Sequence, residues 1–266
     1  MRKITSIEGL RGVLALWVVF GHTLQAAGLG EHWRGPFAVL AAPYNAVQAF
    51  IIVSGFVIFY LLDSAREGYG RFLWRRGLRL YPAYIVCLLV SVLMQSAVLQ
   101  AYTQAPWPNY ANDGKVQITL NSIAFLPAQL AAHLTMTHSL IPDHILPYSN
   151  YAILGQAWSL SLEWQFYVVA PLLFWALLRG YFAAVMVIAV ACAAHFLIGG
   201  NDGVLTRHIP MFAVGIVSYL LWRQPGRPDW PLLVPGGIAL AYLVTHDSAV
   251  VIWAAVFLRV RFESII

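Results

Sequence analysis

An arginine and a histidine lie eleven residues apart in the apolar segment EGLRGVLALWVVFGH. Eleven steps of 100° bring Arg11 and His22 to within about 20° of one helical face, about 16–17 Å apart along the axis. Ionisable groups at such depth in a membrane are costly and are commonly functional. Guanidinium binds phosphate, and neutral imidazole accepts a proton near neutral pH. The alternatives are that Arg11 extends to the membrane surface and that His22 bonds a neighbouring helix.

A second polar pattern occurs in WSLSLEWQFY, where Ser159, Glu163 and Tyr167 recur at every fourth residue. This spacing places all three on one face of a helix. A carboxylate at this position can orient a histidine or accept the proton of a hydroxyl group. Helix capping and an interfacial aromatic belt would explain the serine and the aromatic residues, but they would leave Glu163 without a role.

A third pattern is the arginine-rich segment RFLWRRGLRLYP, in which Arg71, Arg75 and Arg79 form one stripe and Arg76 lies beside it. Guanidinium groups clustered in this way can hold several phosphates of a cytoplasmic cofactor. The alternative is a cluster that sets membrane topology and contacts anionic lipid.

The elements that must position these residues are apolar. Of 266 residues, 60% are hydrophobic and 10% are charged, whereas a soluble domain has about 25% charged residues. Runs of roughly membrane-spanning length fall at about 10–30, 37–62, 80–102, 158–178, 181–199, 205–222 and 230–246, and a shorter run follows at 249–258. We therefore predict an all-α polytopic transmembrane helix bundle of about seven to nine spans, with an uncleaved first helix. In the second run, Ser54 and Gly55 predict close helix packing.

Arginine distribution predicts the orientation in the membrane. With a cytoplasmic N-terminus, a loop at 63–79 lies inside with its five arginines, as the positive-inside rule favours. The arginines after the later runs stay on that side only if residues 118–139 do not cross. We predict that 118–139 is a surface or re-entrant segment on the outer side of an inner (plasma) membrane. The same rule accounts for the net charge of +5, so we expect membrane lipid and no nucleic acid as a partner.

Neither cysteines nor histidines have the spacing of a metal site. Cys87 and Cys192 both lie in apolar runs, so they provide no disulfide framework or zinc site. No histidine pair shows the HExxH interval. We expect no metal and no bound cofactor.

Four segments, in this order, resemble the acyltransferase 3 family of polytopic membrane acyltransferases, which includes O-antigen and peptidoglycan O-acetylases. They are IEGLRGVLALWVVFGH, FIIVSGFVI, RFLWRRGLRLYP and AWSLSLEWQFYVVAPLL, and Arg207 followed by MFAVG is a weaker match. Two departures are present. Many relatives have a second acidic residue where this chain has Trp164, and the family continues through more helices, so we expect the chain to lack the last of them.

The resemblance implies a single membrane-embedded acyltransferase domain over residues 1–266. It implies transfer of an acyl group, usually acetyl, from cytoplasmic acyl-CoA as co-substrate to a hydroxyl group of an envelope or exported carbohydrate. His22 is then catalytic, as a general base or through a transient acyl-imidazole, and Glu163 is the second catalytic candidate. The expected contacts to acyl-CoA or substrate are Arg11, Arg75, Arg76, Arg79, Ser159 and Tyr167.

Two other functions are compatible with a polytopic fold. A small-molecule transporter or channel also carries polar residues inside a helix bundle, but it predicts broken helices in symmetry-related halves, and the sequence contains no internal repeat. A membrane scaffold without activity would leave Arg11, His22 and Glu163 without a role.

Overall fold

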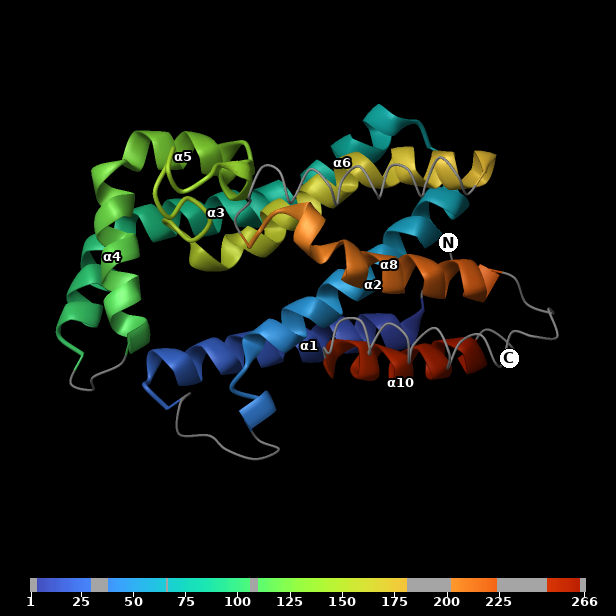
Figure 1. The fold of residues 1–266 in the computed structure, drawn as a ribbon, viewed down its shortest axis with the longest axis horizontal. Coiled ribbons are helices and arrows are strands. Elements are labelled where there is room, and N and C mark those ends of the chain that lie inside the picture. The colour runs from blue at the N-terminus through green and yellow to red at the C-terminus, as the bar shows by residue number, and fades with distance from the viewer. Residues whose placement is uncertain are drawn as a thin grey trace. The chain divides into compact units, whose positions relative to one another are not determined.

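The computed structural model describes residues 4–29, 38–65, 67–105, 110–180, 202–223 and 248–263, and the regular elements within these ranges are helices (Figure 1). This confirms the predicted all-α fold. Five of the described helices are long and apolar enough to cross a membrane. They are α1 (Thr5–Ala26), α2 (Pro43–Ala65), α3 (Tyr69–Thr103), α6 (Trp158–Arg179) and α8 (Leu205–Arg223). The predicted runs at 181–199 and 230–246 lie outside the described residues.

The arginine-rich segment belongs to a helix, which corrects the prediction of a loop at 63–79. Helix α2 ends at Ala65 and α3 begins at Tyr69, so only residues 66–68 separate them. The apolar run ends where the charges begin, but arginine is a good helix former, and the helix therefore continues through the charged residues. The arginines are consequently held on the same rigid element as the apolar span.

Residues 118–139 form no helix of spanning length. The region folds as α4 (Tyr110–Ala124), α5 (Leu126–Leu134) and the 3₁₀ turn η3 (His138–Leu140). The chain breaks at Phe125, and Pro127 lies in the first turn of α5, where a proline is tolerated because its missing N–H has no helical partner. This agrees with the predicted surface or re-entrant segment. Its side of the membrane stays a prediction.

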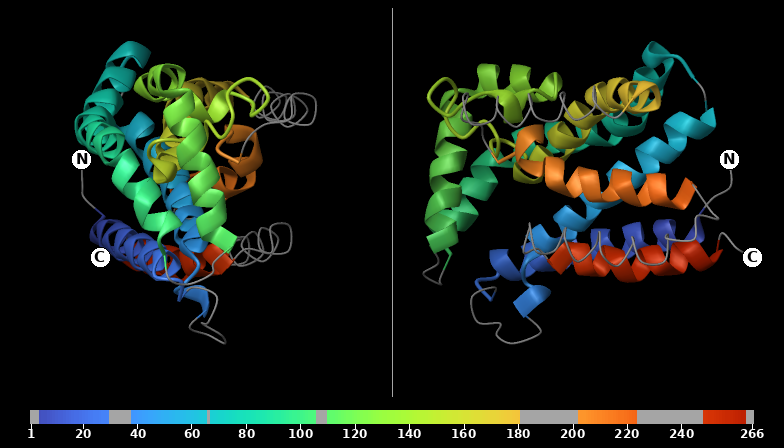
Figure 2. Two further views of the ribbon diagram at one scale, coloured as in Figure 1. Left: turned by 90° about the vertical axis from the view of Figure 1, so that its left-hand side faces the viewer. Right: turned by 45° about the vertical axis from the view of Figure 1, so that its right-hand side comes forward.

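The described helices form two compact units, the first of which comprises residues 1–66 and 208–266. In this unit α1, α2 and α10 (Ser248–Glu263) pack against one another (Figures 1 and 2). The core is aromatic, with the ring of Phe56 within 5.6–6.2 Å of four other rings. Those rings are Tyr219, Trp222, Trp253 and Phe257.

Helices α2 and α8 approach closely through glycine. A Cβ atom added to Gly55 would collide with the carbonyl oxygen of Phe212, and one added to Gly215 would collide with that of Ile52. The colliding atoms belong to the backbone, so neither helix can yield by a change of rotamer. The packing through small residues predicted from Ser54 and Gly55 is therefore confirmed.

The second unit comprises residues 67–207. Helix α3 packs against α4 and α6, and α6 follows a short 3₁₀ turn, η4 (Gly155–Ala157). Much of the remaining surface of α3 is apolar and exposed, with Leu93 82% and Trp74 69% exposed. Large exposed apolar surfaces mark membrane or partner contacts, and here they fit a lipid-facing helix.

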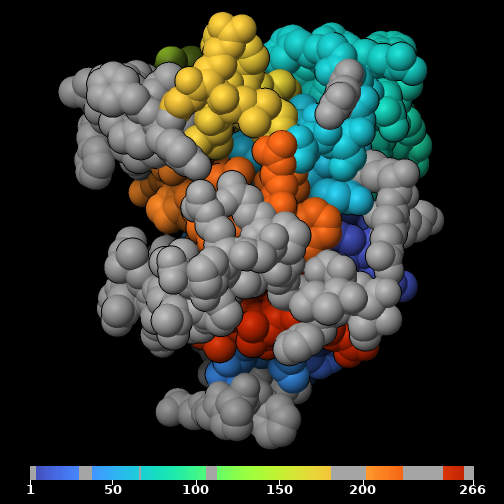
Figure 3. Space-filling model, turned by 90° about the vertical axis from the view of Figure 1, so that its right-hand side faces the viewer, coloured from blue at the N-terminus to red at the C-terminus, as the bar shows by residue number. Residues whose placement is uncertain are grey.

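The C-terminal end of α6 also suits a membrane boundary. It reaches the face drawn in Figure 3 (yellow) and exposes Trp175 and Leu178. The guanidinium of Arg179 lies 4.4 Å from the centroid of the Trp175 ring. Aromatic and basic residues of this kind anchor helix ends at the membrane–water interface.

Candidate functional site

Three of the predicted site residues lie together in the second unit. On α6, the hydroxyl of Tyr167 donates a hydrogen bond to Glu163 Oε1 one turn earlier. On α3, the guanidinium of Arg76 lies 5.8 Å from the centroid of the Tyr167 ring and 5.8 Å from that of Phe72. Arg76 is 8% exposed and Tyr167 2%. We refer to Arg76, Tyr167 and Glu163 as the α3–α6 charge cluster.

Two features create this cluster: the interval of four residues between Glu163 and Tyr167, and the packing of α3 on α6. Spacing at i and i+4 puts Glu163 and Tyr167 on one face of α6, and that face meets the buried side of α3. A buried guanidinium is costly unless charge and hydrogen bonds compensate it. The carboxylate and two aromatic faces provide part of that compensation. Arg76 Nε has no partner among the described residues, so the cluster retains one free donor.

The other arginines of α3 point to a different environment. Arg71, Arg75 and Arg79 are exposed, as expected for one stripe of a helix. Arg75 Nη1 pairs with Glu67 Oε2 at 2.9 Å, whereas Arg71 and Arg79 have no carboxylate within ion-pair distance among the described residues. The charge of Arg79 also acts on Tyr167. The predicted stripe is thus exposed, whereas Arg76, which the sequence places beside the stripe, is buried.

Ser159 is not part of the charge cluster. It lies at the start of α6, and its hydroxyl donates a hydrogen bond to the carbonyl of Gln156 at 3.1 Å. This contact is local, and two helical turns separate it from Tyr167. Of the three α6 residues predicted on one face, only Glu163 and Tyr167 contact each other.

Arg11 and His22 belong to the first unit. Helix α1 is continuous through both residues, so they lie on one helix with the spacing predicted from the sequence. Both are half-buried and flank the buried face of α1 that contains Leu14 and Gly21. Arg11 Nη1 lies 3.8 Å from Glu8 Oε1, with 29% of the arginine side chain exposed. Their catalytic and donor-binding roles stay predictions.

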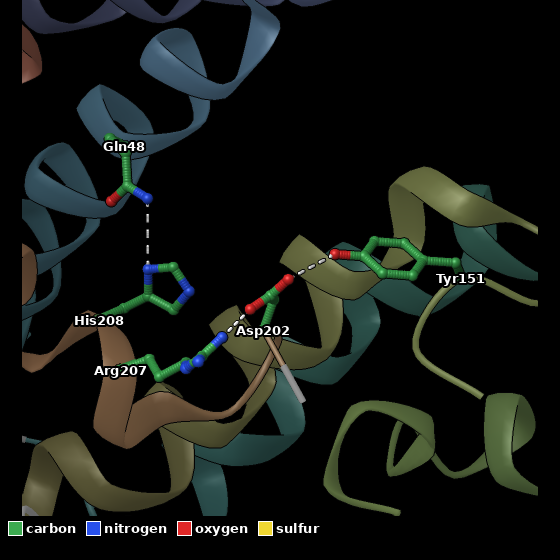
Figure 4. Close-up of polar contacts among 5 residues, drawn as sticks. All are labelled: Gln48, Tyr151, Asp202, Arg207 and His208. Atoms are coloured by element: carbon green, nitrogen blue, oxygen red, sulfur yellow. Dashed lines mark hydrogen bonds and ion pairs between the residues drawn. The ribbon is translucent and has the colours of Figure 1, made fainter. Parts of the chain in front are cut away.

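The second unit contains another polar network, whose residues the sequence pattern did not group together. The hydroxyl of Tyr151 donates to Asp202 Oδ2 at 3.1 Å, and the other carboxylate oxygen accepts from Arg207 (Figure 4). Gln165 on α6 donates to the carbonyl of Gly203 and accepts from the N–H of Leu205, both at 2.9 Å. Within the second unit, these bonds hold residues 202–207 against Tyr151 and α6. One indication of this network was present in the sequence, the weak family match at Arg207.

Three histidines outside the predicted site, His133, His138 and His208, are buried and contact other side chains. In the first unit, Gln48 Nε2 lies 3.4 Å from His208 Nδ1 in a buried contact between α2 and α8 (Figure 4). In the second, His133 and His138 stack with ring centroids 4.0 Å apart. Burial lowers the pKa of both rings, and with the added effect of His133 it lowers that of His138 to about 3. The i, i+5 spacing across a helix end gave no sequence signal for this pair.

The residues described contain no group of three or more His, Cys, Asp or Glu that could hold a metal ion.

Comparison with known proteins identifies the chain's family. A family model described as an acyltransferase domain, that of acyltransferase 3, matches residues 4–261. The chain belongs to the acyltransferase 3 family. The matched range contains all four motifs on which the resemblance was based, and the resemblance is confirmed.

Two relatives come from rhizobia. The chain is 23% identical over 268 residues to nodulation protein 10 of Rhizobium leguminosarum bv. viciae, covering 92% of this chain and 66% of that protein. It is 38% identical over 86 residues to protein 2 in the picA locus of Rhizobium radiobacter, covering 31% of this chain and 40% of that protein. The chain thus spans about two thirds and two fifths of these relatives. No solved structure matches it.

Proposed function

We propose that this acyltransferase 3 member transfers an acyl group, acetyl as the first candidate, from cytoplasmic acyl-CoA to a hydroxyl group of an envelope or exported carbohydrate. It does so as one membrane-embedded domain of the inner membrane, with its N-terminus in the cytoplasm. Family membership and five span-length helices support a membrane acyltransferase. The observation that carries the finer proposal is the α3–α6 charge cluster, in which a buried cation, a phenol and a carboxylate are in contact.

Donor binding is assigned to the arginines of α3 and to Arg11. CoA carries several phosphates, and the planar fork of guanidinium matches phosphate oxygens in bidentate geometry. Exposed Arg79 has no carboxylate partner among the described residues, so it is available to a phosphate. Arg75 must exchange Glu67 for the donor. Arg76 supports the charge cluster behind this exposed stripe.

Acyl transfer is assigned to His22 with Glu163. The acceptor oxygen attacks the thioester carbonyl, the new C–O bond forms, the C–S bond breaks, and CoA leaves as the thiol once its sulfur gains a proton. Neutral His22 takes the hydroxyl proton as general base and returns it to the sulfur. In the alternative, the imidazole attacks the thioester first, the C–S bond breaks and CoA leaves as thiolate. The acceptor oxygen then takes the acyl group as the C–N bond breaks, and its hydroxyl proton passes to the thiolate. Glu163, fixed by Tyr167, is the second proposed proton acceptor.

The proposal is tested in cells by the acylation of envelope glycans. A strain that lacks the gene is complemented with the wild-type gene or with an empty vector. Base-labile esters on its envelope and exported carbohydrates are then quantified by mass spectrometry and NMR. We expect one carbohydrate fraction to carry esters only with the wild-type gene. Identical ester content in every fraction of both strains would contradict the proposed function.

A further inference from the structure

A cavity of about 380 Å³ lies in the second unit, away from the charge cluster. It is lined by the C-terminal part of α3, by α4 and by the segment 151–156. Its volume falls within the range of about 300–1,000 Å³ typical of small-molecule sites. Gln95, in its wall, follows Arg76 by nineteen residues on α3, which is about 28 Å along a helix axis. The cavity is therefore at the opposite end of α3 from the arginines.

The amide of Gln95 is the first feature of the cavity that indicates a ligand. Gln95 is 6% exposed, and both its Nε2 and its Oε1 lack hydrogen-bond partners among the described residues. Buried polar groups normally have partners. A primary amide presents a donor and an acceptor side by side, and two neighbouring hydroxyl groups of a sugar ring can satisfy both.

Lys115 is the second feature. It is one of two lysines in the chain, the other being Lys3, and it lines the same cavity. Its ammonium lies 3.6 Å from the position of a Cβ on Gly155, and no carboxylate pairs with it in the part of the chain that the structure describes. Burial lowers the pKa of Lys115. A negative charge on a ligand would compensate this half-buried cation.

The other polar groups near the cavity leave room for such a ligand. Tyr151 lines the cavity and donates its proton to Asp202, but the charge of Asp202 is already paired with Arg207 (Figure 4). Further hydroxyl groups in the wall come from Ser91, Tyr102, Thr119 and Ser122. Sites for anionic lipid headgroups typically gather several Lys and Arg residues. One cation among many uncharged hydrogen-bonding groups favours a sugar.

We propose that this cavity binds an acidic carbohydrate, with the sugar carboxylate paired to Lys115 and neighbouring hydroxyl groups bonded to the amide of Gln95. That this sugar belongs to the same carbohydrate that is acylated rests on the proposed function, and the bound sugar ring itself lies too far from the charge cluster to be acylated there. If the arginine end of α3 faces the cytoplasm, the cavity lies toward the outer side, where envelope carbohydrates are found. Binding itself requires neither acyl-CoA nor transfer.

The test observes Lys115 directly. The full chain with Lys3→Arg is purified into phosphatidylcholine nanodiscs and reductively methylated with ¹³C-formaldehyde, so that Lys115 and the N-terminal amine are the labelled groups. Glucuronate, titrated in, is expected to shift the Lys115 resonance saturably and to raise its pKa, while the N-terminal resonance stays unchanged. Glucose at equal concentration is expected to produce at most a weak shift. Gln95→Leu should weaken glucuronate binding on the order of tenfold, and Gln100→Leu, exposed on the same helix, should not.

Saturation-transfer NMR on Lys115→Met provides a second measurement, in which the preference for glucuronate over glucose should disappear. No saturable shift with glucuronate, or equal responses to both sugars, would overturn the inference. Phosphatidylglycerol nanodiscs that shift the resonance and block glucuronate would assign the cavity to a lipid headgroup and overturn it too. Intact glucuronate binding without acyl transfer to any glycan would contradict the proposed function and support this inference.

Discussion

The two units of the chain differ in how fully their polar side chains are paired. In the first, Asp63 accepts a hydrogen bond from the hydroxyl of Tyr219 at 2.5 Å and pairs with Arg223 at 3.0 Å. The indole of Trp253 donates to Ser218 at 2.9 Å. These bonds join helices that already pack through glycines and aromatic rings, so the polar groups of this unit mainly fix its helices.

In the second unit, buried polar groups more often lack partners. Both amide atoms of Gln95 and of Asn150 have none among the described residues. Each such group costs about 1–3 kcal/mol unless water or a ligand supplies the bond. The second unit therefore leaves more of its buried polar atoms open to water or a ligand than the first unit, which is the frame that carries His22.

The largest effect is expected in the frame. Gly215→Val places side-chain atoms against the carbonyl of Ile52, and overpacking of a core costs about 1–3 kcal/mol even when neighbours can adjust. Because backbone cannot adjust by a rotamer change, we expect loss of folded protein, measured as membrane accumulation and by detergent-extracted size exclusion. Gly12→Ala, whose Cβ meets nothing within 4 Å, is the control. Normal accumulation of Gly215→Val would contradict the close packing of α2 and α8.

Glu163→Gln tests whether the charge cluster serves chemistry. The amide keeps the size of the side chain but removes its charge and proton affinity. We expect kcat for acyl transfer to fall at least about 100-fold, the lower range for losing an acid–base group, with unchanged protein level. Trp164→Phe, a neighbour without a titratable group, is the control. A Glu163→Gln protein that fails to accumulate would show that the carboxylate is structural, as in the first unit.

Arg79→Gln and Arg75→Gln compare an arginine without a carboxylate partner among the described residues with one that is paired to Glu67. A hydrogen bond to a charged group contributes about 1.5–3 kcal/mol, so losing a phosphate contact at Arg79 should raise KM for acyl-CoA about tenfold or more. Arg75 is already paired with Glu67, and we expect a smaller rise for its variant. Initial rates against donor concentration measure both. Equal KM values in both variants and wild type would contradict donor binding. They would indicate that the stripe sets membrane topology and contacts anionic lipid.

The stacked histidines predict a pH dependence in the second unit. Burial holds the pKa of His138 at about 3, against 6.5 in an unfolded chain. Above pH 6.5 both states are neutral and stability is complete. As pH falls from 6.5 toward 3, the unfolded state takes up a proton that the folded state excludes, so stability drops by about 1.4 kcal/mol per pH unit for this histidine.

Hydrogen exchange of α5 and η3 between pH 7 and 5 measures this loss, after correction for intrinsic exchange rates. His138→Phe should reduce the pH dependence, while His144→Gln, an exposed position, should leave it unchanged. The same slope in His138→Phe as in wild type would assign the dependence to other groups.

The sequence was sufficient for the all-α fold, the family and the close packing at Gly55, because apolar runs and small residues act locally. It missed the start of α3, since hydropathy reports burial in lipid and arginine does not end a helix. It also missed the Gln95–Lys115 cavity, whose residues meet only when α3 packs on α4. Likewise, the helical spacing set Arg76 apart from the stripe of Arg71, Arg75 and Arg79 but did not show that Arg76 is buried, which depends on the Tyr167 face of α6.

The most direct test of the account is acyl transfer by purified protein. Wild type, His22→Ala and His144→Ala are reconstituted, and radiolabelled acetyl-CoA is supplied with the carbohydrate fraction identified in cells. We predict that wild type and His144→Ala form labelled ester, and that His22→Ala loses about 10²–10⁴ in rate, the usual cost of an acid–base group, while retaining its fold. A label trapped on His22 would select the acyl-imidazole route over general-base catalysis. Ester formation by well-folded His22→Ala at the wild-type rate would contradict the account.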